Sequence, residues 1–237
     1  MSTIFLFIKF FDKQEYAQAF LEGKVFANRL SAFRTHEGED TTGRIDGDEG
    51  TTSWLQGENV KLVLNGMDLS EGLMTLQVQM DSLSDFHLFC MHAVHSGDVD
   101  LETISHDNIE VLREALLVDD ACLSLGPYAV VISDIAAFMS RLKRSCADNG
   151  YRGKSRLVKY YDPDTFHGTF EGLEGVFWKQ TKFSFQREFR VAIDTHTSGE
   201  DPLTLEIGDI SDIASLIEAS AVNGEGLLGG TLSVEAR

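Results

Sequence analysis

The order of apolar and polar residues along the chain predicts an alternation of short strands and helices. Polar and apolar residues alternate, or apolar residues form short unbroken runs, in the segments that we expect to be strands: 4–11, 24–30, 60–64, 73–80, 85–94, 128–133, 156–161, 183–194 and 203–207. Helical spacing predicts about four helices, at 13–22, 107–117, 134–147 and 211–221. This mixture favours an α+β fold with a mixed, largely antiparallel sheet, either continuous or split.

Domain organisation follows from the same pattern. Strand and helix signals continue without a linker as far as residue 222, which predicts one domain over 1–222. The glycine-rich remainder, 223–237, is expected to be a partly flexible tail. Residues 35–50 have no apolar period and are rich in glycine and acids, so they predict a long loop. Loops of more than about 12 residues within a domain are uncommon and are often functional.

Composition and charge exclude several classes of protein. The chain has 237 residues, 43% of them hydrophobic, and a net charge of −18. That much apolar residue is enough for a packed core, while the negative charge disfavours nonspecific binding to nucleic acid or to an anionic membrane. No apolar run approaches the roughly 20 residues of a membrane-spanning helix. Three widely spaced cysteines indicate reduced thiols, and we expect a cytoplasmic protein.

The most informative stretch is FWKQTKFSFQREFR at 177–190. On a strand from Phe183, the side chains of Gln186, Glu188 and Arg190 would share one face, roughly 7 Å apart along the strand. Three polar side chains on one face could all contact the same ligand. The alternative is an ordinary solvent-facing row whose ion pairs are each worth under ~1 kcal/mol.

Residues 35–50 carry the second set of candidate side chains. The loop has four acids that could bind Ca²⁺ or Mg²⁺: Asp40, Asp46, Asp48 and Glu49. Their spacing does not match the D-x-D-x-D-G calcium loop, so no metal is expected. A second reading pairs Arg44 with Asp46 or Glu49 to hold the loop over a cleft, and a third is a solvated acidic loop. Strand geometry also disfavours a zinc site in FHLFCMHAVH, because His87 would face away from Cys90.

A family resemblance covers almost the whole chain. The segments KFF, FLEGKVFANRLSAFRTHE, GRIDGDEGT and FWKQTKFSFQREFR resemble a large family of uncharacterised bacterial and phage proteins, a domain of unknown function. Its sharpest parts are an RxDxxEG-type loop, here Arg44 to Gly50, and a KxxxFxxQxEFR stretch, here 179–190. The resemblance gives weight to Asp46 and Glu49, and it implies a role in a bacterial or phage conflict system.

The layout also resembles, more weakly, the ADP-ribosyltransferase fold. Members of that family bind NAD on a split antiparallel sheet, and Gln186-Arg187-Glu188 resembles their Gln/Glu-x-Glu motif. The resemblance implies that Glu188 is the catalytic carboxylate, which would stabilise an oxocarbenium-like centre, and that Gln186 orients the acceptor. The residues implied to bind the dinucleotide are Lys9, Arg34, Arg44 and Arg190. A Ser-Thr-Ser element of that family has no clear counterpart.

A second hypothesis comes from a different class of function. The 18 net negative charges would steer a basic partner to the surface, so the protein could be a non-catalytic acidic protein that binds and masks a basic protein. The densest acidic cluster, however, is one loop rather than a row along exposed helices.

Overall fold

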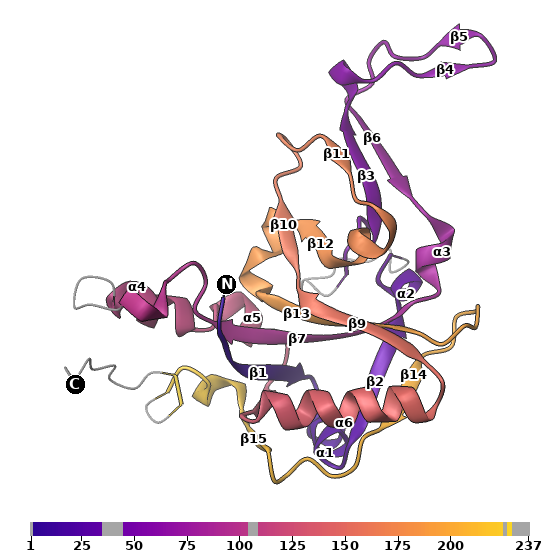
Figure 1. The fold of residues 1–237 in the computed structure, drawn as a ribbon. Coiled ribbons are helices and arrows are strands. Elements are labelled where there is room, and N and C mark those ends of the chain that lie inside the picture. Colours follow the sequence, from indigo (N-terminus) through magenta and orange to yellow (C-terminus); the bar gives the residue numbers. More distant parts are fainter. Residues whose placement is uncertain (1, 35–44, 104–108, 225–226, 229–237) are drawn as a thin grey trace.

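The computed structural model describes residues 2–34, 45–103, 109–224 and 227–228 (Figure 1). Most of the chain forms a body built on one twisted, antiparallel sheet. Its strands are β1 (Ile4–Phe11), β2 (Lys24–Arg29), β7 (His87–His95), β8 (Tyr128–Ile132), β9 (Arg152–Leu157), β13 (Glu188–Asp194), β14 (Leu203–Glu206) and β15 (Ala214–Glu218). The expected α+β class with a largely antiparallel sheet is confirmed.

The long strand β7 is the centre of this sheet. Strands β1 and β2 share one of its edges: β1 pairs with residues 92–95 and β2 with residues 87–88. The other edge pairs with β13 along most of its length, and β13 in turn pairs with β9. In the described pairing, residues 89–91 of β7 lie between β1 and β2 without a strand on that edge. The sheet is therefore split at this point.

Two helices pack against the sheet to form the main core. They are α1 (Gln14–Leu21) and α6 (Ile135–Asp148), which both lie below the sheet in Figure 1. Their apolar faces meet strand residues in a buried aromatic cluster that includes Phe7, Phe20, Phe89 and Phe138. Each such side chain buried contributes roughly 1.5–3 kcal/mol to folding.

The remaining helices are short, with one exception. Helix α4 (Ile109–Leu116) has eight residues, whereas α2 (Leu30–Arg34), α3 (Asp81–Ser84) and α5 (Asp120–Leu123) each span little more than one turn. Within the described ranges, three α-helices thus have eight residues or more, so the expected number of about four is only a loose description. No helix of the described chain is both long and apolar enough to cross a membrane.

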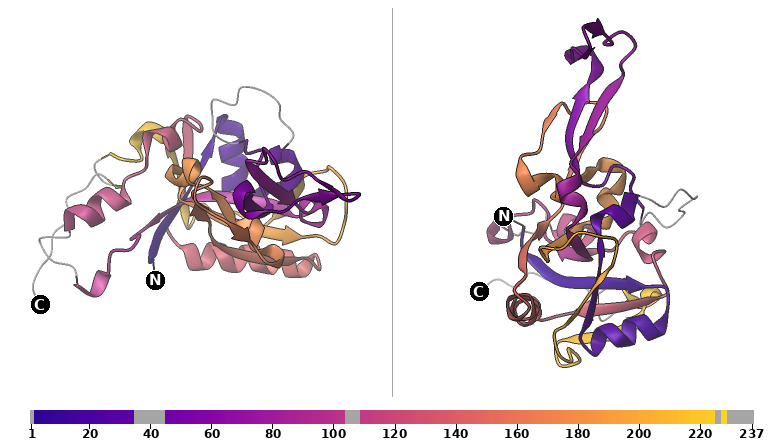
Figure 2. Two further views of the ribbon diagram at one scale, coloured as in Figure 1. Left: turned by 90° about the horizontal axis from the view of Figure 1, so that it is seen from above. Right: turned by 90° about the vertical axis from the view of Figure 1, so that its right-hand side faces the viewer.

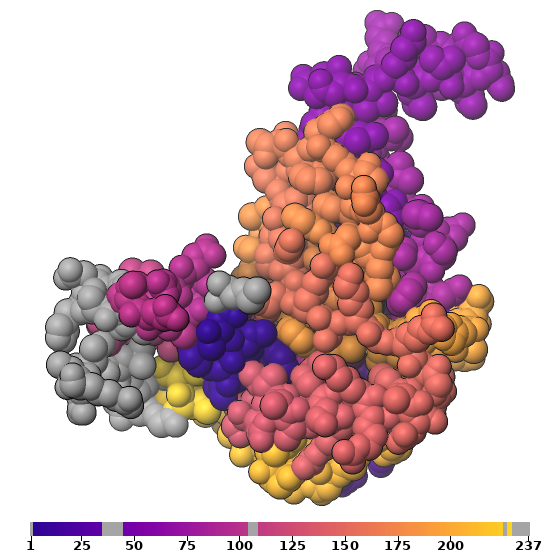
Figure 3. Space-filling model, in the orientation of Figure 1, coloured from indigo at the N-terminus to yellow at the C-terminus, as the bar shows by residue number. Residues whose placement is uncertain are grey.

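A narrow arm, residues 51–80, projects from the body (Figures 1 and 3). It consists of β3 (Thr51–Gln56) and β6 (Thr75–Gln79), with a small hairpin, β4 (Val63–Leu64) and β5 (Met67–Asp68), at its tip. Figure 2 shows the arm extending away from the sheet in a second view. Near its base, β3 also pairs with β11 (Gly168–Thr169). The short strands β10 (Lys159–Tyr161) and β12 (Trp178–Gln180), which pair in parallel, lie beside this base.

Three sequence-based expectations about elements are wrong. The helix expected at 211–221 is instead strand β15, which pairs with β8 over Ala214–Glu218. Its apolar residues fit either period, and pairing with the edge of β8 satisfies the backbone groups of both strands. Of the strand expected at 60–64, only Val63–Leu64 form a strand, β4, which pairs within the tip hairpin. The partner of β6 is instead β3, a strand that the pattern did not predict.

The third correction concerns the stretch around the QRE motif. The strand expected from residue 183 begins only at Glu188, because Thr181–Gln186 form a 3-10 helix, η4. Arg187 between them adopts a left-handed backbone conformation, with φ of 41°. Because of this kink, Gln186 lies outside strand β13, which begins at Glu188. The two side chains therefore do not share a strand face. Of the expected tail, Asn223 bonds the backbone of Val118, while residues 225–226 and 229–237 lie outside the described residues.

Candidate functional site

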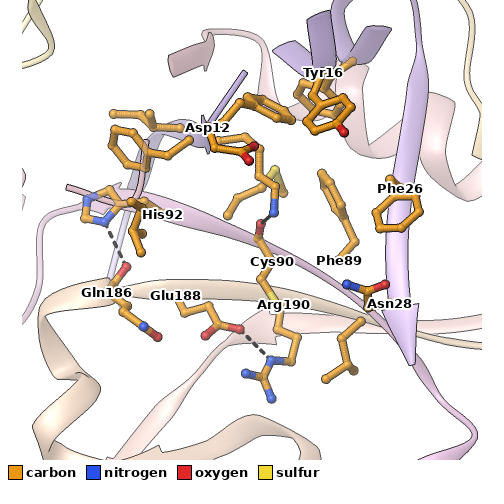
Figure 4. Close-up of a pocket in the computed structure, with 18 of the residues that line it drawn as sticks. Asp12, Tyr16, Phe26, Asn28, Phe89, Cys90, His92, Gln186, Glu188 and Arg190 are labelled. Atoms are coloured by element: carbon orange, nitrogen blue, oxygen red, sulfur yellow. Dashed lines mark hydrogen bonds and ion pairs between the residues drawn. The ribbon is translucent and has the colours of Figure 1, made fainter. Parts of the chain in front are cut away.

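A cavity of about 670 Å³ opens where β1 and β2 separate along β7 (Figure 4). Residues of β1, α1 and β2 form its outer walls, and residues 88–92 of β7 cross its floor. Aromatic side chains line much of it, among them Tyr16 and Phe26, whose side chains are about half exposed. Small-molecule sites commonly have this size and this mixture of apolar wall and few polar groups.

Four charged side chains meet at one end of the cavity and form a buried cluster. Arg190 donates from Nε to Glu188 Oε1 at 2.6 Å and from its terminal nitrogens to both carboxylate oxygens of Glu49, at 3.2 Å for Nη2 to Oε2. Lys179 Nζ lies 3.2 Å from Glu188 Oε2 and 3.6 Å from Glu49 Oε2. All four line the cavity, and none is more than 5% exposed. Two carboxylates and two cations make this cluster neutral.

Burial and charge act on the pKa values of the cluster in opposite directions. Burial alone would raise the pKa of Glu188, but the charges of Arg190 and Lys179 outweigh it and hold that pKa below its ordinary value. Burial would lower the pKa of Lys179, but Glu188 and Glu49 raise it above the ordinary value. Glu188 and Lys179 are therefore both charged at neutral pH. Their charges are also fixed in place, because each carboxylate oxygen of Glu188 accepts from a buried cation.

The loop that follows α2 supplies Glu49 to this cluster. Arg34, at the end of α2, donates from Nε to the Glu49 carbonyl oxygen at 2.7 Å and from Nη1 to Ser84 Oγ at 3.0 Å. Asp46 is 3% exposed and accepts the Asp48 backbone N–H at 3.0 Å, and burial together with the Glu49 charge raises its pKa to about 6. The reading of this region as a solvated acidic loop is wrong for Asp46 and Glu49, which are both buried.

Gln186 lies beside the cluster and connects it to a buried histidine. Its side-chain Oε1 accepts from Lys179 Nζ at 2.9 Å, and its backbone carbonyl lies 2.9 Å from His92 Nδ1. Burial lowers the pKa of His92 to about 4, so the ring is neutral at pH 7. A carbonyl can only accept, which places the ring proton on Nδ1 and leaves Nε2 as an acceptor. His92 and Cys122 both line the cavity, and Cys122 Sγ is 3.5 Å from His92 Nδ1.

Lys9 reaches into the split from β1. Its Nζ donates to the backbone carbonyl of Cys90 at 2.6 Å and lies 5.1 Å from the centre of the Phe89 ring. Cys90 belongs to the part of β7 that pairs with neither β1 nor β2. The Lys9 ammonium therefore donates to a carbonyl oxygen that would otherwise accept an N–H from a neighbouring strand. Lys9 thus stabilises the open form of the sheet and lines the cavity at the same time.

The structure brings together most of the residues that the sequence singled out. Those that line the cavity are Lys9, Glu49, Gln186, Glu188 and Arg190. Arg34 and Asp46 instead support the loop that carries Glu49. Arg44 lies outside the described residues, so its expected pairing stays a prediction.

Sequence reasoning missed two contributors to the cluster. One is Lys179, on β12. The other is Tyr160, on β10, whose hydroxyl accepts the Glu188 backbone N–H at 3.0 Å. Lys179 had a signal, because it is the first residue of the KxxxFxxQxEFR stretch. The two motifs of the resemblance therefore meet in space, since Glu49 belongs to one and Lys179, Glu188 and Arg190 to the other.

Compared with known proteins, the chain matches no family model, no curated protein and no solved structure. Among the described residues, no group of three or more His, Cys, Asp or Glu side chains is arranged to hold a metal ion. As expected, His87 lies apart from Cys90 and His92: its Nε2 lies 3.1 Å from the carbonyl of Asp201, outside the cavity.

Proposed function

We propose that the cavity binds NAD and that the protein is ADP-ribosyltransferase-like. The observation that carries this proposal is the position of Glu188, a buried ionised carboxylate in the wall of a cavity that opens at a split in an antiparallel sheet. The strands that contribute Lys9, Cys90 and Glu188 are neighbours in the order β1, β7, β13. Cavity-lining cations, Lys9 and Lys24 among them, suit a pyrophosphate, and the half-exposed Tyr16 and Phe26 suit an aromatic base.

The chemistry asked of the protein is mainly electrostatic. When the bond between ribose and nicotinamide breaks, its electron pair leaves with nicotinamide and positive charge develops on the ribose. A carboxylate held in advance near that charge stabilises it without reorganising. Arg190 and Lys179 keep the carboxylate of Glu188 ionised and oriented, although they also offset part of its charge. Each carboxylate oxygen can accept more than one hydrogen bond, so a ribose hydroxyl can still donate to it.

Gln186 is the residue proposed to orient the acceptor. Its side-chain carbonyl is already held by Lys179, which fixes the direction of the amide. The resemblance to bacterial and phage proteins supports a role for this reaction in the conflict between bacteria and phages.

Calorimetry with NAD, followed by a nicotinamide-release assay, tests the proposal. We expect binding of NAD by the unaltered protein, and loss of release by several orders of magnitude in Glu188→Gln. Glu174→Gln is the matched control, because Glu174 pairs with Lys154 and Arg156 outside the cavity. No binding at about millimolar NAD, the range of weak affinities near −4 kcal/mol, would contradict the proposal.

A second variant separates ligand binding from folding, because Glu188 is buried. Phe26 lines the cavity but is 53% exposed, so Phe26→Asp should leave the fold intact while placing a negative charge beside the phosphates. We expect weaker NAD binding with an unchanged melting temperature. Unchanged binding in Phe26→Asp would place NAD outside this cavity.

A further inference from the structure

The arm exposes an unusual amount of apolar side chain. Large hydrophobic side chains that are at least 36% exposed are sparse elsewhere in the described chain, but seven of them lie within residues 63–80. They are Val63, Leu64, Met67, Leu69, Met74, Val78 and Met80, and Met74 is 87% exposed. Clustered exposed apolar residues of this kind mark an interaction surface rather than the ordinary scatter of a monomer.

Strand β6 carries its apolar residues on the outward side. Residues of even number from 74 to 80 are all apolar, whereas Gln77 and Gln79 point back to the base of the arm. Gln77 Nε2 donates to Thr51 Oγ1 at 2.7 Å, and Gln79 Nε2 donates to the Gly47 carbonyl at 3.0 Å. Leu55 of β3 pairs with Leu76 and so extends the same apolar face. This is the reverse of the pattern expected for a solvent-facing strand.

The outer edge of β6 is open as well. In the described part of the chain, β3 lies between β11 and β6, and β6 pairs with no strand on its other side. Residues 73–80, LMTLQVQM, contain no charge, proline or glycine. Monomeric proteins usually protect such an edge with a charge, a proline or a bulge, because its free N–H and C=O groups otherwise pair with another chain.

We propose that a second copy of this chain covers the arm, with the two β6 edges side by side across a two-fold axis. An isologous contact of this kind gives both open edges a partner at once. The arm's own charge opposes such a contact only weakly. Residues 51–80 contain three acids and one lysine, a net charge of −2 out of −18. A stable interface buries roughly 800 Å² on each partner, and the exposed apolar side chains of the arm supply surface toward that area.

Sedimentation velocity from about 1 µM to about 100 µM tests this dimer, since its population rises with concentration. We expect the unaltered protein to sediment as a dimer at the upper concentrations. Met74→Glu should weaken the dimer about tenfold or more without changing the thermal melt, because Met74 makes little contact with its own chain. Val111→Glu on α4 is the matched control: Val111 is 55% exposed, and this variant should dimerise normally.

Hydrogen exchange locates the contact independently of any substitution. Amides of β6 should exchange more slowly as concentration rises, while amides of α4 should not change. A protein that stays monomeric up to about 100 µM would overturn the proposal. So would a dimer that Met74→Glu leaves intact, or one whose β6 exchange is independent of concentration, because the contact would then lie elsewhere.

Discussion

At the scale of single residues, the cavity depends on a buried set of charges that the fold must keep balanced. Removing one member of a buried ion pair leaves its partner unpaired in a low-dielectric site, which costs far more than losing an exposed pair. The structure places four such members within one cluster, so substitutions there test both folding and function.

Glu188→Gln should lower the free energy of unfolding by ~3 kcal/mol at pH 7. The variant removes a carboxylate that accepts from both Arg190 and Lys179. The folded-state pKa of Glu188 is lowered, so its stabilising contribution is present above the unfolded pKa near 4.5 and is lost as the pH falls below it. Urea unfolding gives the free energy of unfolding of the variant and of the unaltered protein at each pH. We expect the difference between the two proteins to be smaller at pH 4 than at pH 7.

The control for this variant is the half-exposed pair of Glu174. Glu174→Gln should cost less than ~1 kcal/mol, because solvent screens that pair. Equal costs for Glu188→Gln and Glu174→Gln would mean that the charge cluster does not exist in the folded protein.

Asp46→Asn should stabilise the protein, with an effect that depends on pH. Burial and Glu49 raise the folded-state pKa of Asp46 to about 6 from 3.8. A raised carboxyl pKa costs stability as the pH rises from the unfolded value to the folded one, because the unfolded chain releases the proton first. The variant should gain about 3 kcal/mol above pH 7 and well under ~1 kcal/mol near pH 4. A difference in free energy of unfolding between the two proteins that stays constant from pH 4 to pH 8 would contradict this prediction.

At the scale of elements, the arm is separable from the body, because few contacts join its tip to the rest of the chain. Gly57 closes the tip: its N–H donates to the Met74 carbonyl at 2.8 Å, and a Cβ at this glycine would lie 1.7 Å from the Leu73 carbonyl oxygen. Only glycine permits that close approach of two backbones.

Gly57→Ala should therefore loosen the arm and leave the body unchanged. We expect faster hydrogen exchange in residues 57–74 and no change in the amides of β7 or β13. Gly47→Ala is the control, since a Cβ at Gly47 would meet nothing within 4 Å. Exchange that speeds up throughout the protein would show that the arm unfolds together with the body.

At the scale of the whole molecule, the net charge of −18 is the dominant property. Self-repulsion of this charge destabilises the compact state, and salt screens it over a Debye length of about 10 Å at 0.1 M. The alternative function, an acidic protein that masks a basic partner, draws on the same field and stays a prediction.

The melting temperature should rise by a few degrees when the salt concentration increases from about 10 mM to about 200 mM. Screening weakens the general repulsion, while the pairs in the buried cluster are screened much less. Differential scanning calorimetry in a series of NaCl concentrations measures this directly. A melting temperature that falls with salt would mean that surface ion pairs, rather than net repulsion, dominate the electrostatics.

Elements with an unambiguous side-chain pattern could be predicted from the amino-acid order alone. The strands around Phe7, Phe89 and Val130 follow from period, and the helix expected at 134–147 follows from period and capping. In these segments the local order of side chains decides which face is buried. The amino-acid order also indicated that Glu49, Glu188 and Arg190 matter, through two motifs that are far apart in the chain.

How those motifs combine depends on packing between segments that are distant in the chain. Ile213 and Ile217 fit a helix as well as a strand, and the open edge of β8 selected the strand. The left-handed Arg187 separates Gln186 from the strand of Glu188, which no alternation pattern records. The contact between Glu49 and Arg190 spans 141 residues of sequence. Such a pair is set by the strand order that places the loop after α2 beside β13, and that order is a property of the packed sheet rather than of any local segment.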